Sequence, residues 1–334
     1  MKFGLRLPSF ALGPKTATLH EMGAYLRRAE DLGFDSAVVI DHLLIVPPAT
    51  VGTWLEPMVL LAALAGVTRT IKLGPLVLVL PLRNPVYFAK EWATFDVLSG
   101  GRSIFGVGVG WHEQEFKVMN VPRHERGRRM DEMLEAVMAL WAGDDVTYRG
   151  KYYQFENVTV EPKPLQRPHP PIWIGGGTQP FETIYAQSVP DITPVLRRIA
   201  KYAKTWVPHS PSTPAMVTDD WTKIQGFLAE YGRPPDDLTK AYSNFVYVLK
   251  KGENPESALP HISTISGMTL DFWRNFYLLG EAEEVADRIR AKIDALGGGV
   301  EHVILNPVNF GMEQLELLAG EVRPRVAPGL EPRR

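Results

Sequence analysis

Residues 103–115 read SIFGVGVGWHEQE, and their character changes in the middle. Its first half is apolar with glycines at alternate positions, and its second half is polar. The change is typical of a buried parallel strand that ends in a polar mouth, and the alternate glycines would let a flat group approach the backbone. Chemistry in a closed parallel barrel collects at the carboxyl ends of the strands. We therefore expect a ligand beside Trp111, His112, Glu113 and Gln114.

On either side of this stretch, strand patterns alternate with helix patterns along the chain. The strand candidates are residues 3–7, 35–40, 71–80, 103–110, 172–174, 205–207, 242–249 and 301–307. Helix patterns follow at 19–32, 56–67, from 85, and at 126–141, 193–204, 214–231, 255–266, 281–296 and 312–322. The alternation predicts an α/β protein with the fold of a (β/α)8 TIM barrel.

Three segments interrupt this alternation. Residues 144–164 are rich in β-prone aromatic side chains around an Arg149-Gly150 turn, which predicts a hairpin inserted outside the barrel. Residues 181–192 and 260–280 are predicted to be irregular insertions.

Length and composition limit the class of protein. A chain of 334 residues with 45% hydrophobic residues can bury one large core, so we expect one domain over residues 1–334. The formal net charge of −2 comes without a basic stripe, so no nucleic-acid partner is expected. The absence of cysteine excludes disulfides and thiol catalysis. No apolar run reaches the ~20 residues of a membrane span, so we expect no membrane partner and a cytoplasmic location.

Asp41 and His42 come directly after the second strand and are the best candidates for acid–base chemistry or ligand orientation, because imidazole titrates near neutral pH. The alternative is a pair that caps the loop. His112 and Glu113 stand at another strand end, but neighbouring side chains point apart, so at most one of them faces a ligand. Trp111 is the better candidate for a pocket wall.

The glycine-rich run of Gly175, Gly176, Gly177 and Thr178 follows the fifth strand. Its backbone N–H groups could close on a phosphate, and the same glycines could form an ordinary turn. The eight histidines lack the HxH or HExxH spacing of a metal site, so no metal is expected. The glycines of residues 106–110 lie within a strand and do not have the spacing of a dinucleotide-binding fingerprint.

Five segments together resemble the bacterial luciferase-like superfamily, and most closely its branch that uses the deazaflavin coenzyme F420. They are VVIDHLL (38–44), LGPLVLVLPLRNP (73–85), SGGRSIFGVGVGWHEQEF (99–116), ERGRRMDEMLE (125–135) and PIWIGGG (171–177). The resemblance covers roughly the first 180 residues. The remainder is similar only in its barrel pattern and in EHVILNP (301–307).

The resemblance implies a flavin or deazaflavin in the barrel mouth, and often a homodimer. Asp41 and His42 match family positions beside the ring system, and Gly175, Gly176, Gly177 and Thr178 match the phosphate loop. The bulged third strand that backs the ring, where members often have a non-proline cis peptide, is matched by Leu76, Val77, Leu78 and Val79. Trp111 stands where the sugar-phosphate dehydrogenases of the family carry a glutamate, which is evidence against glucose 6-phosphate as the substrate. Arg126 matches an arginine of the family's RGRR helix, and the resemblance implies a structural role for it.

The function that follows is hydride transfer between F420 and a small, largely apolar organic substrate. His42 is then the leading proton donor or acceptor, with Asp41, Trp111 and Glu113 as further candidates. One alternative is a two-component monooxygenase that uses reduced FMN from a separate flavin reductase. Another is a noncatalytic flavin-binding relative, although the chain retains Asp41, His42 and the glycine loop.

Overall fold

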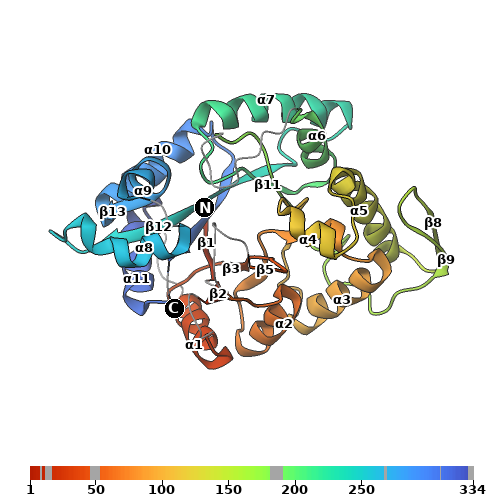
Figure 1. Cartoon of the computed structure of the whole chain (residues 1–334), viewed down its shortest axis with the longest axis horizontal. Coiled ribbons are helices and arrows are strands. Elements are labelled where there is room, and N and C mark those ends of the chain that lie inside the picture. The colour runs from red at the N-terminus through yellow and green to blue at the C-terminus, as the bar shows by residue number, and fades with distance from the viewer. Residues whose placement is uncertain are drawn as a thin grey trace.

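A closed ring of parallel strands forms the centre of the protein (Figure 1). The fold is that of a computed structural model, which describes residues 1–7, 10–11, 17–45, 53–180, 191–266, 269–308 and 310–329. Its barrel strands are β1 (Lys2–Arg6), β3 (Ser36–Val39), β5 (Lys72–Pro75) with β6 (Leu78–Val79), β7 (Phe105–Gly108), β10 (Ile172–Gly175), β11 (Thr205–Val207), β12 (Thr239–Leu249) and β14 (Val300–Pro307).

The register of the strands closes the ring. β14 pairs with β1, Leu73 of β5 bridges to Ser103 just before β7, and β6 pairs with β7. β5 and β6 are therefore two parts of one broken strand, as the sequence indicated. The barrel thus has eight strand positions within the described residues, which confirms the predicted TIM-barrel fold.

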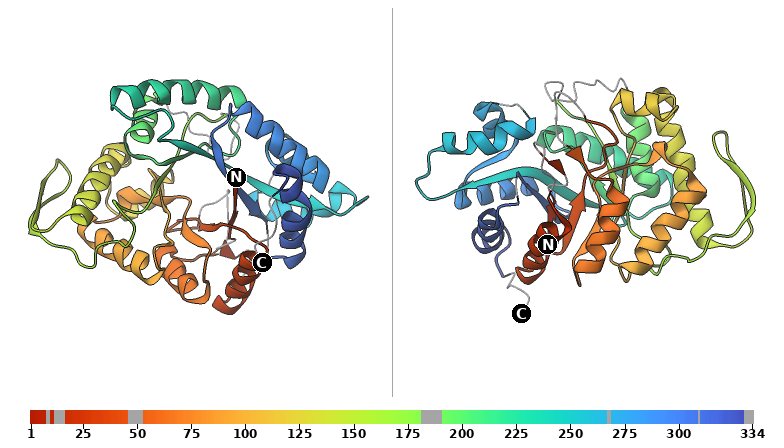
Figure 2. Two further views of the ribbon diagram at one scale, coloured as in Figure 1. Left: turned by 180° about the vertical axis from the view of Figure 1, so that it is seen from behind. Right: turned by 60° about the horizontal axis from the view of Figure 1, so that its bottom comes forward.

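Helices surround the ring (Figures 1 and 2). They are α1 (Leu19–Asp31), α2 (Pro57–Val67), α3 (Pro85–Leu98), α5 (Arg126–Ala142), α6 (Thr193–Tyr202), α7 (Pro214–Glu230), α10 (Ala282–Ala295), α11 (Met312–Leu317), the π-helix η4 (Leu318–Val322) and α12 (Arg323–Val326). Thr18, Asn84 and Thr213 accept hydrogen bonds from backbone N–H groups in the first turns of α1, α3 and α7. These caps satisfy donors that a helix end leaves unpaired, which explains where the helices begin.

The two faces of each strand have different surroundings. Val38, Ile104 and Ile304 form part of a small apolar cluster inside the barrel, whereas Val39 and Phe105 belong to the larger core beneath the helices. Successive side chains point to opposite faces of a strand, so every second side chain fills the barrel interior and the others pack against the surrounding helices. Polar side chains that follow the strands are then left at the carboxyl ends.

The alternate glycines of residues 103–115 pack closely against the broken third strand. A Cβ on Gly106 would lie 1.9 Å from the Pro75 carbonyl oxygen, and one on Gly108 would lie 2.4 Å from Val77 Cγ2. A Cβ on Gly110 would lie 2.5 Å from a methyl group of Val79. Residues 75, 77 and 79 thus occupy the space beside the three glycines. The expectation that a flat ligand approaches this backbone is wrong, because the neighbouring strand already lies there.

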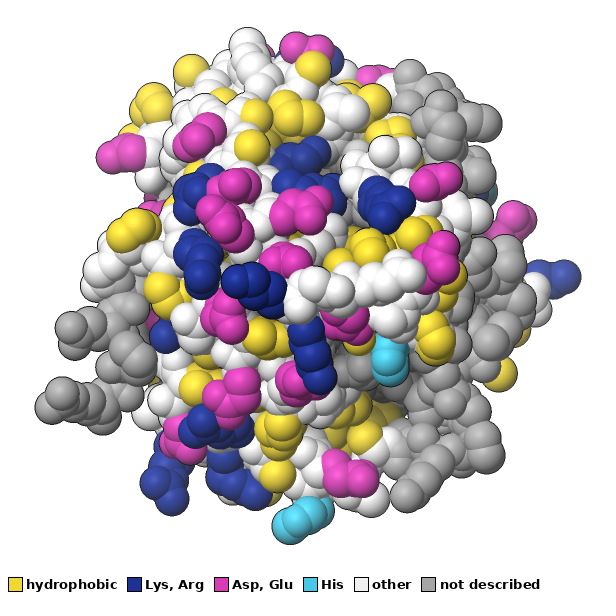
Figure 3. All heavy atoms as spheres, turned by 90° about the vertical axis from the view of Figure 1, so that its left-hand side faces the viewer, with side chains coloured by type: hydrophobic (Ala, Val, Ile, Leu, Met, Phe, Trp, Pro, Cys, Tyr) yellow, Lys and Arg dark blue, Asp and Glu magenta, His cyan; other side chains and the backbone are white. Residues whose placement is uncertain are grey.

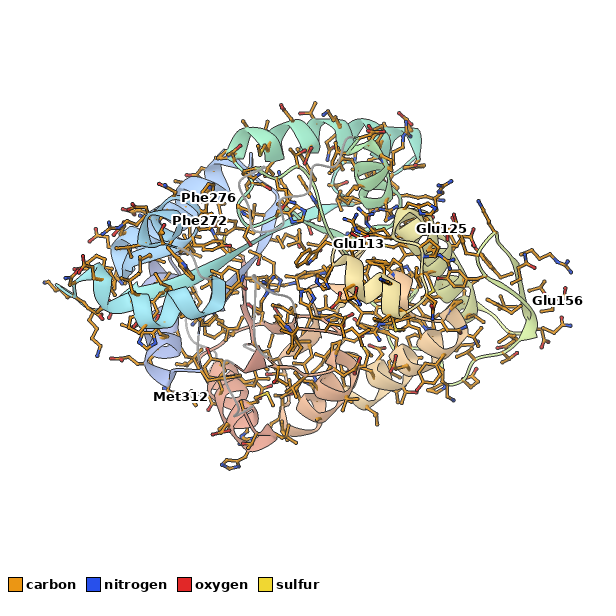
Figure 4. All side chains as sticks on the ribbon, in the orientation of Figure 1. Glu113, Glu125, Glu156, Phe272, Phe276 and Met312 are labelled. Carbon is orange, nitrogen blue, oxygen red and sulfur yellow. The ribbon has the colours of Figure 1, made fainter. Side chains whose placement is uncertain are left out.

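The predicted hairpin is present outside the barrel. β8 (Val146–Arg149) and β9 (Gln154–Val158) pair antiparallel, and Glu156 lies at the end of the hairpin away from the ring of helices (Figure 4). A second antiparallel pair, β2 (Phe10–Ala11) with β4 (Thr53–Trp54), was not predicted. The predicted insertion at 181–192 lies outside the described residues, apart from 191 and 192.

The prediction of irregular structure at 260–280 is wrong. This segment contains most of α8 (Leu259–Ser266), together with α9 (Leu270–Phe276) and most of β13 (Leu278–Glu281), and the short helix η3 (Pro255–Ala258) precedes it. β12 continues beyond the barrel, and its second half pairs with β13. Thr269 caps α9, and Trp273 is completely buried beside Tyr247 and Tyr277. This second apolar cluster therefore explains why the segment forms regular helices and a strand.

The surface shows no segregation of charge on the face that carries α8 and α9, where acidic and basic side chains alternate (Figure 3). Within the described ranges, no helix is both long enough and apolar enough to cross a membrane.

Candidate functional site

His42 and Glu115 meet at the carboxyl end of the barrel. His42 follows β3, and Glu115 lies in the short helix α4 (Glu113–Val118), which follows β7. The imidazole Nδ1 is 3.1 Å from Glu115 Oε1, and the two side chains are 12% and 1% exposed. Two strand ends that are distant in sequence thus supply one buried polar pair.

The carboxylate of Glu115 is held by several donors. Its Oε1 also accepts hydrogen bonds from the backbone N–H groups of Leu43 at 2.8 Å and Leu44 at 3.2 Å. Burial alone would raise the pKa of this carboxyl, but the bonds from His42 and from the two N–H groups hold the pKa of Glu115 below its ordinary value. Glu115 is therefore ionised at neutral pH.

Aromatic rings pack against the imidazole. The centroid of the Trp54 ring is 4.8 Å from that of His42, and the Trp111 ring is 5.9 Å away in an edge-to-face arrangement. Trp111 also contacts the ring of His112 at 5.4 Å. The Trp111 ring therefore lies beside the imidazole of His42, and its role as a pocket wall stays a prediction.

Glu113 does not share this environment. It is exposed at the first residue of α4, which lies beside the centre of the ring of helices (Figure 4). Glu115, two residues later, faces inward together with the buried Phe116. The structure therefore brings Glu115 to His42, and sequence reasoning missed it. The apolar Phe116 beside Glu115 was the available signal, because it marks the inward face of the helix.

Asp41 lies next to His42 but contacts different groups. Its Oδ2 accepts hydrogen bonds from the backbone N–H of Val79 at 2.8 Å and from the Arg83 guanidinium at 3.0 Å. Asp41 is 8% exposed, and Arg83 reaches on to Glu56. These contacts attach the broken third strand to the end of β3, so Asp41 supports the mouth of the barrel.

The peptide bond between Leu76 and Val77 is cis, as the family resemblance implied. The Val77 side chain lies inside the barrel against the backbone positions of Gly108 and Gly175. Leu78 and Val79 then continue into β6, and both are buried. Leu76 and Val77 therefore face the barrel interior, whereas Leu78 belongs to the core beneath the helices.

Hydrogen-bond donors of the glycine loop are bonded to other parts of the protein. The Gly176 N–H donates to the Val207 carbonyl, and the N–H and hydroxyl of Thr178 both donate to Asp220, at 2.6 and 2.8 Å. Gly176 and Gly177 have φ angles of 151° and 133°, which only glycine adopts readily. In this arrangement the loop is a turn fixed to α7, and the carboxylate of Asp220 occupies the donors of Thr178 that a phosphate would need.

The helix that packs against this loop carries Arg198, whose charge acts on Arg126. Gly176 packs against Val195 in the first turn of α6, and Arg198 of the same helix binds Asp131 and the Gly127 carbonyl. Burial lowers the pKa of Arg126, and the charges of Arg123 and Arg198 lower it further. A half-buried guanidinium among other cations suits an anion.

Several buried polar atoms at the carboxyl end of the barrel have no hydrogen-bond partner among the described residues. They include His112 Nδ1, after β7, Gln179 Oε1, after β10, and Asn306 Oδ1, in β14. Buried polar atoms are usually paired, so these three are suited to a polar ligand. The described residues contain no group of three His, Asp or Glu side chains that could hold a metal ion.

Comparison with known proteins agrees with this architecture. The FMNH2-dependent dimethylsulfone monooxygenase of Pseudomonas putida is 36% identical over 127 residues, which are 37% of this chain and 35% of that protein. The chain thus spans less than half the length of the curated relatives it matches.

Two solved structures share the fold over nearly the whole chain. The monooxygenase RslO1 from Streptomyces bottropensis has a TM-score of 0.74 with 24% identity, covering 98% of this chain and 100% of that one. An F420-dependent secondary alcohol dehydrogenase in complex with an F420–acetone adduct has a TM-score of 0.78 with 17% identity, covering 97% and 98%. The family model described as luciferase-like monooxygenase matches residues 1–266, so the chain belongs to the luciferase-like monooxygenase family.

Proposed function

We propose that this protein is an oxidoreductase that transfers a hydride between the deazaflavin coenzyme F420 and a small, largely apolar substrate. The observation that carries the proposal is the His42–Glu115 pair, which offers an oriented imidazole at the barrel mouth. Hydride transfer at an alcohol or carbonyl carbon requires a group that takes or gives the oxygen-bound proton. The bound deazaflavin would supply the hydride acceptor or donor.

The walls of the site support a small apolar substrate. Trp54 and Trp111 flank His42, and Val77 faces the barrel interior nearby. Such surfaces exclude water and favour apolar groups, while the imidazole supplies polarity at one point. The buried carboxylate of Glu115 argues against the noncatalytic alternative, since a buried charge without a function is costly to keep.

A two-component monooxygenase that uses reduced FMN is the second candidate. The name of the Pseudomonas putida relative favours it, because that protein is described as FMNH2-dependent. The F420-dependent structural neighbour favours the first candidate only through the fold. In the second case a separate flavin reductase would be the partner of this chain.

The cofactor is the first thing to measure. Purified protein is titrated with F420 and with FMN, and turnover is followed anaerobically by deazaflavin absorbance with an alcohol or carbonyl substrate. We expect F420 binding and anaerobic turnover. Binding of FMN alone, with oxygen consumed only after a flavin reductase is added, would establish the monooxygenase instead.

We further propose that the cofactor's phosphate lies beside Arg126, because the donors of Thr178 are occupied by Asp220. Arg126→Met should weaken cofactor binding by about 10- to 100-fold, the usual worth of a charged hydrogen bond. Arg128→Met, an exposed residue on the same helix, is the matched control. Equal affinities of the two variants would place the phosphate elsewhere.

A homodimer is proposed from the surface of α2 and α3. α2 reads PMVLLAALAGV without a charged residue, yet Val59 is 71% exposed, and Tyr87 of α3 is 72% exposed. A helix that is apolar on all sides is normally buried, and exposed apolar patches mark interfaces. Val59→Glu should give monomers in sedimentation, whereas Met312→Glu on α11 should not. A monomeric wild type would contradict the proposal.

The cytoplasmic location stays a prediction.

A further inference from the structure

We infer that Glu115 is a positioning residue that keeps a proton on His42 Nδ1, so that Nε2 acts as the base toward a hydroxyl-bearing substrate. The inference rests on the proposed hydride transfer and narrows the substrate to an alcohol. It also gives the direction of the reaction: an unprotonated Nε2 can accept a proton, which suits oxidation of the alcohol.

The contacts of Glu115 decide where the proton lies. An ionised carboxylate only accepts hydrogen bonds, so the nitrogen 3.1 Å from its Oε1 must donate. The backbone N–H groups of Leu43 and Leu44 donate to the same oxygen. A buried carboxylate that has three donors and is 1% exposed stays ionised, which agrees with its lowered pKa. The neutral imidazole is then the Nδ1–H tautomer.

The surrounding rings fix the orientation of the imidazole. Trp54 packs 4.8 Å from the His42 ring at an angle of 53°, and Trp111 packs 5.9 Å away at 87°. A flipped ring would turn a carbon toward Glu115 and remove one of its three donors. In the bonded orientation Nε2 lies on the side of the ring away from Glu115, and it carries the free lone pair.

The chemical step is balanced with the proposed cofactor. Nε2 accepts the hydroxyl proton of the substrate as the O–H bond breaks, and a carbon–oxygen double bond forms. The electron pair of the adjacent C–H bond leaves as hydride to the oxidised deazaflavin, which is the oxidant. Glu115 remains ionised throughout and stabilises the imidazolium that results.

Other charged groups lie near this pair. Asp41 is bound to Arg83, and Arg83 also reaches Glu56. His112 contacts Trp111, and Arg123 donates to the Trp111 carbonyl. The contact at His42 Nδ1 is with Glu115 Oε1 at 3.1 Å, so a change at Glu115 alters the charge that the imidazole bonds directly.

The tautomer can be measured without cofactor or substrate. Long-range proton–nitrogen NMR of histidine-labelled protein distinguishes Nδ1–H from Nε2–H, and His42→Gln assigns the signal among the eight histidines. We expect Nδ1–H in the wild type and a mixture of tautomers in Glu115→Gln. An Nε2–H signal in the wild type, or no change in the variant, overturns the inference.

The matched control is Glu30→Gln. Glu30 also accepts backbone hydrogen bonds, from Arg69, Thr70 and Ile71, and among the described residues it binds no histidine. Both variants lose a carboxylate that caps N–H groups, so a general loss of stability affects both. Only Glu115→Gln should change the His42 tautomer.

Turnover is the second readout. Glu115→Gln should lower kcat by at least about 10²-fold with little change in KM. An equal fall in kcat in Glu30→Gln would make Glu115 merely structural. If the wild type has the Nδ1–H tautomer but binds neither F420 nor FMN, the proposed function is refuted while the assignment of the proton stands.

Discussion

The fit between the glycines of β7 and the broken third strand predicts a graded response to added methyl groups. Real Cβ contacts essentially never fall below 3.0 Å. Gly106→Ala would require the Pro75 carbonyl to retreat by at least 1.1 Å (3.0 − 1.9), and Gly108→Ala would require Val77 Cγ2 to retreat by 0.6 Å (3.0 − 2.4). The first obstacle is backbone and the second is a side chain, so the first variant should be much the less stable.

Overpacking of a core costs about 1–3 kcal/mol, and occasionally more. We expect Gly108→Ala to lose about 1–3 kcal/mol of unfolding free energy, and Gly106→Ala to lose more or to fail to fold. Val77→Ala removes the methyl groups that obstruct Gly108, so the double variant Val77→Ala, Gly108→Ala should be more stable than the sum of the two single losses predicts. Val77→Ala should not rescue Gly106→Ala.

Urea unfolding followed by fluorescence and circular dichroism measures these differences, with coincident transitions as the condition for comparing free energies. Gly226→Ala is the control, because its Cβ meets no atom within 4 Å on the exposed face of α7. It should be neutral or stabilising by up to about 1 kcal/mol. Strict additivity of Val77→Ala with Gly108→Ala would refute the reasoning.

Three further predictions concern buried polar groups. Burial, with nearby positive charges, lowers the pKa of His302 to about 3, whereas the same histidine in the unfolded chain takes up its proton near pH 6.5. The unfolded state therefore binds more protons below pH 6.5, and the free energy of unfolding falls there by up to about 1.4 kcal/mol per pH unit, while above pH 6.5 nothing is lost. His302→Gln should flatten this acid dependence in thermal unfolding, and an unchanged slope would exclude His302 as its source. Asp220→Asn should cost about 1–3 kcal/mol in urea unfolding, because Thr178 loses a charged acceptor, and no loss would contradict the fixed turn. Asp41→Asn should cost a similar amount through its bond to Arg83, and equal stability to the wild type would show that this contact is weak.

Much of the fold could be predicted because strands and helices leave local patterns. The glycine-spaced apolar run at 103–110 and the helix pattern at 126–141 each correspond to an observed element. α9 and β13 were missed because their order comes from packing around Trp273, against a strand some 30 residues earlier in the chain. Periodicity within a short segment does not record such a contact.

The candidate site could be predicted only where chemistry and strand position coincide. His42 and Trp111 follow strands, and the structure brings their rings together. The partner of His42 was missed because only the apolar Phe116 marks which of Glu113 and Glu115 faces inward on α4. Asp220 binds Thr178 from 42 positions away, and no spacing rule relates the two residues.

The glycine register of β7 also constrains how this family can change. Each glycine faces one particular residue of the third strand, so a one-residue deletion in either segment would set methyl groups and carbonyls against each other along the whole contact. The two segments are therefore expected to vary together among relatives. Where the third strand is regular, bulky residues should replace Gly106 and Gly108, and where it is broken, both glycines should be retained.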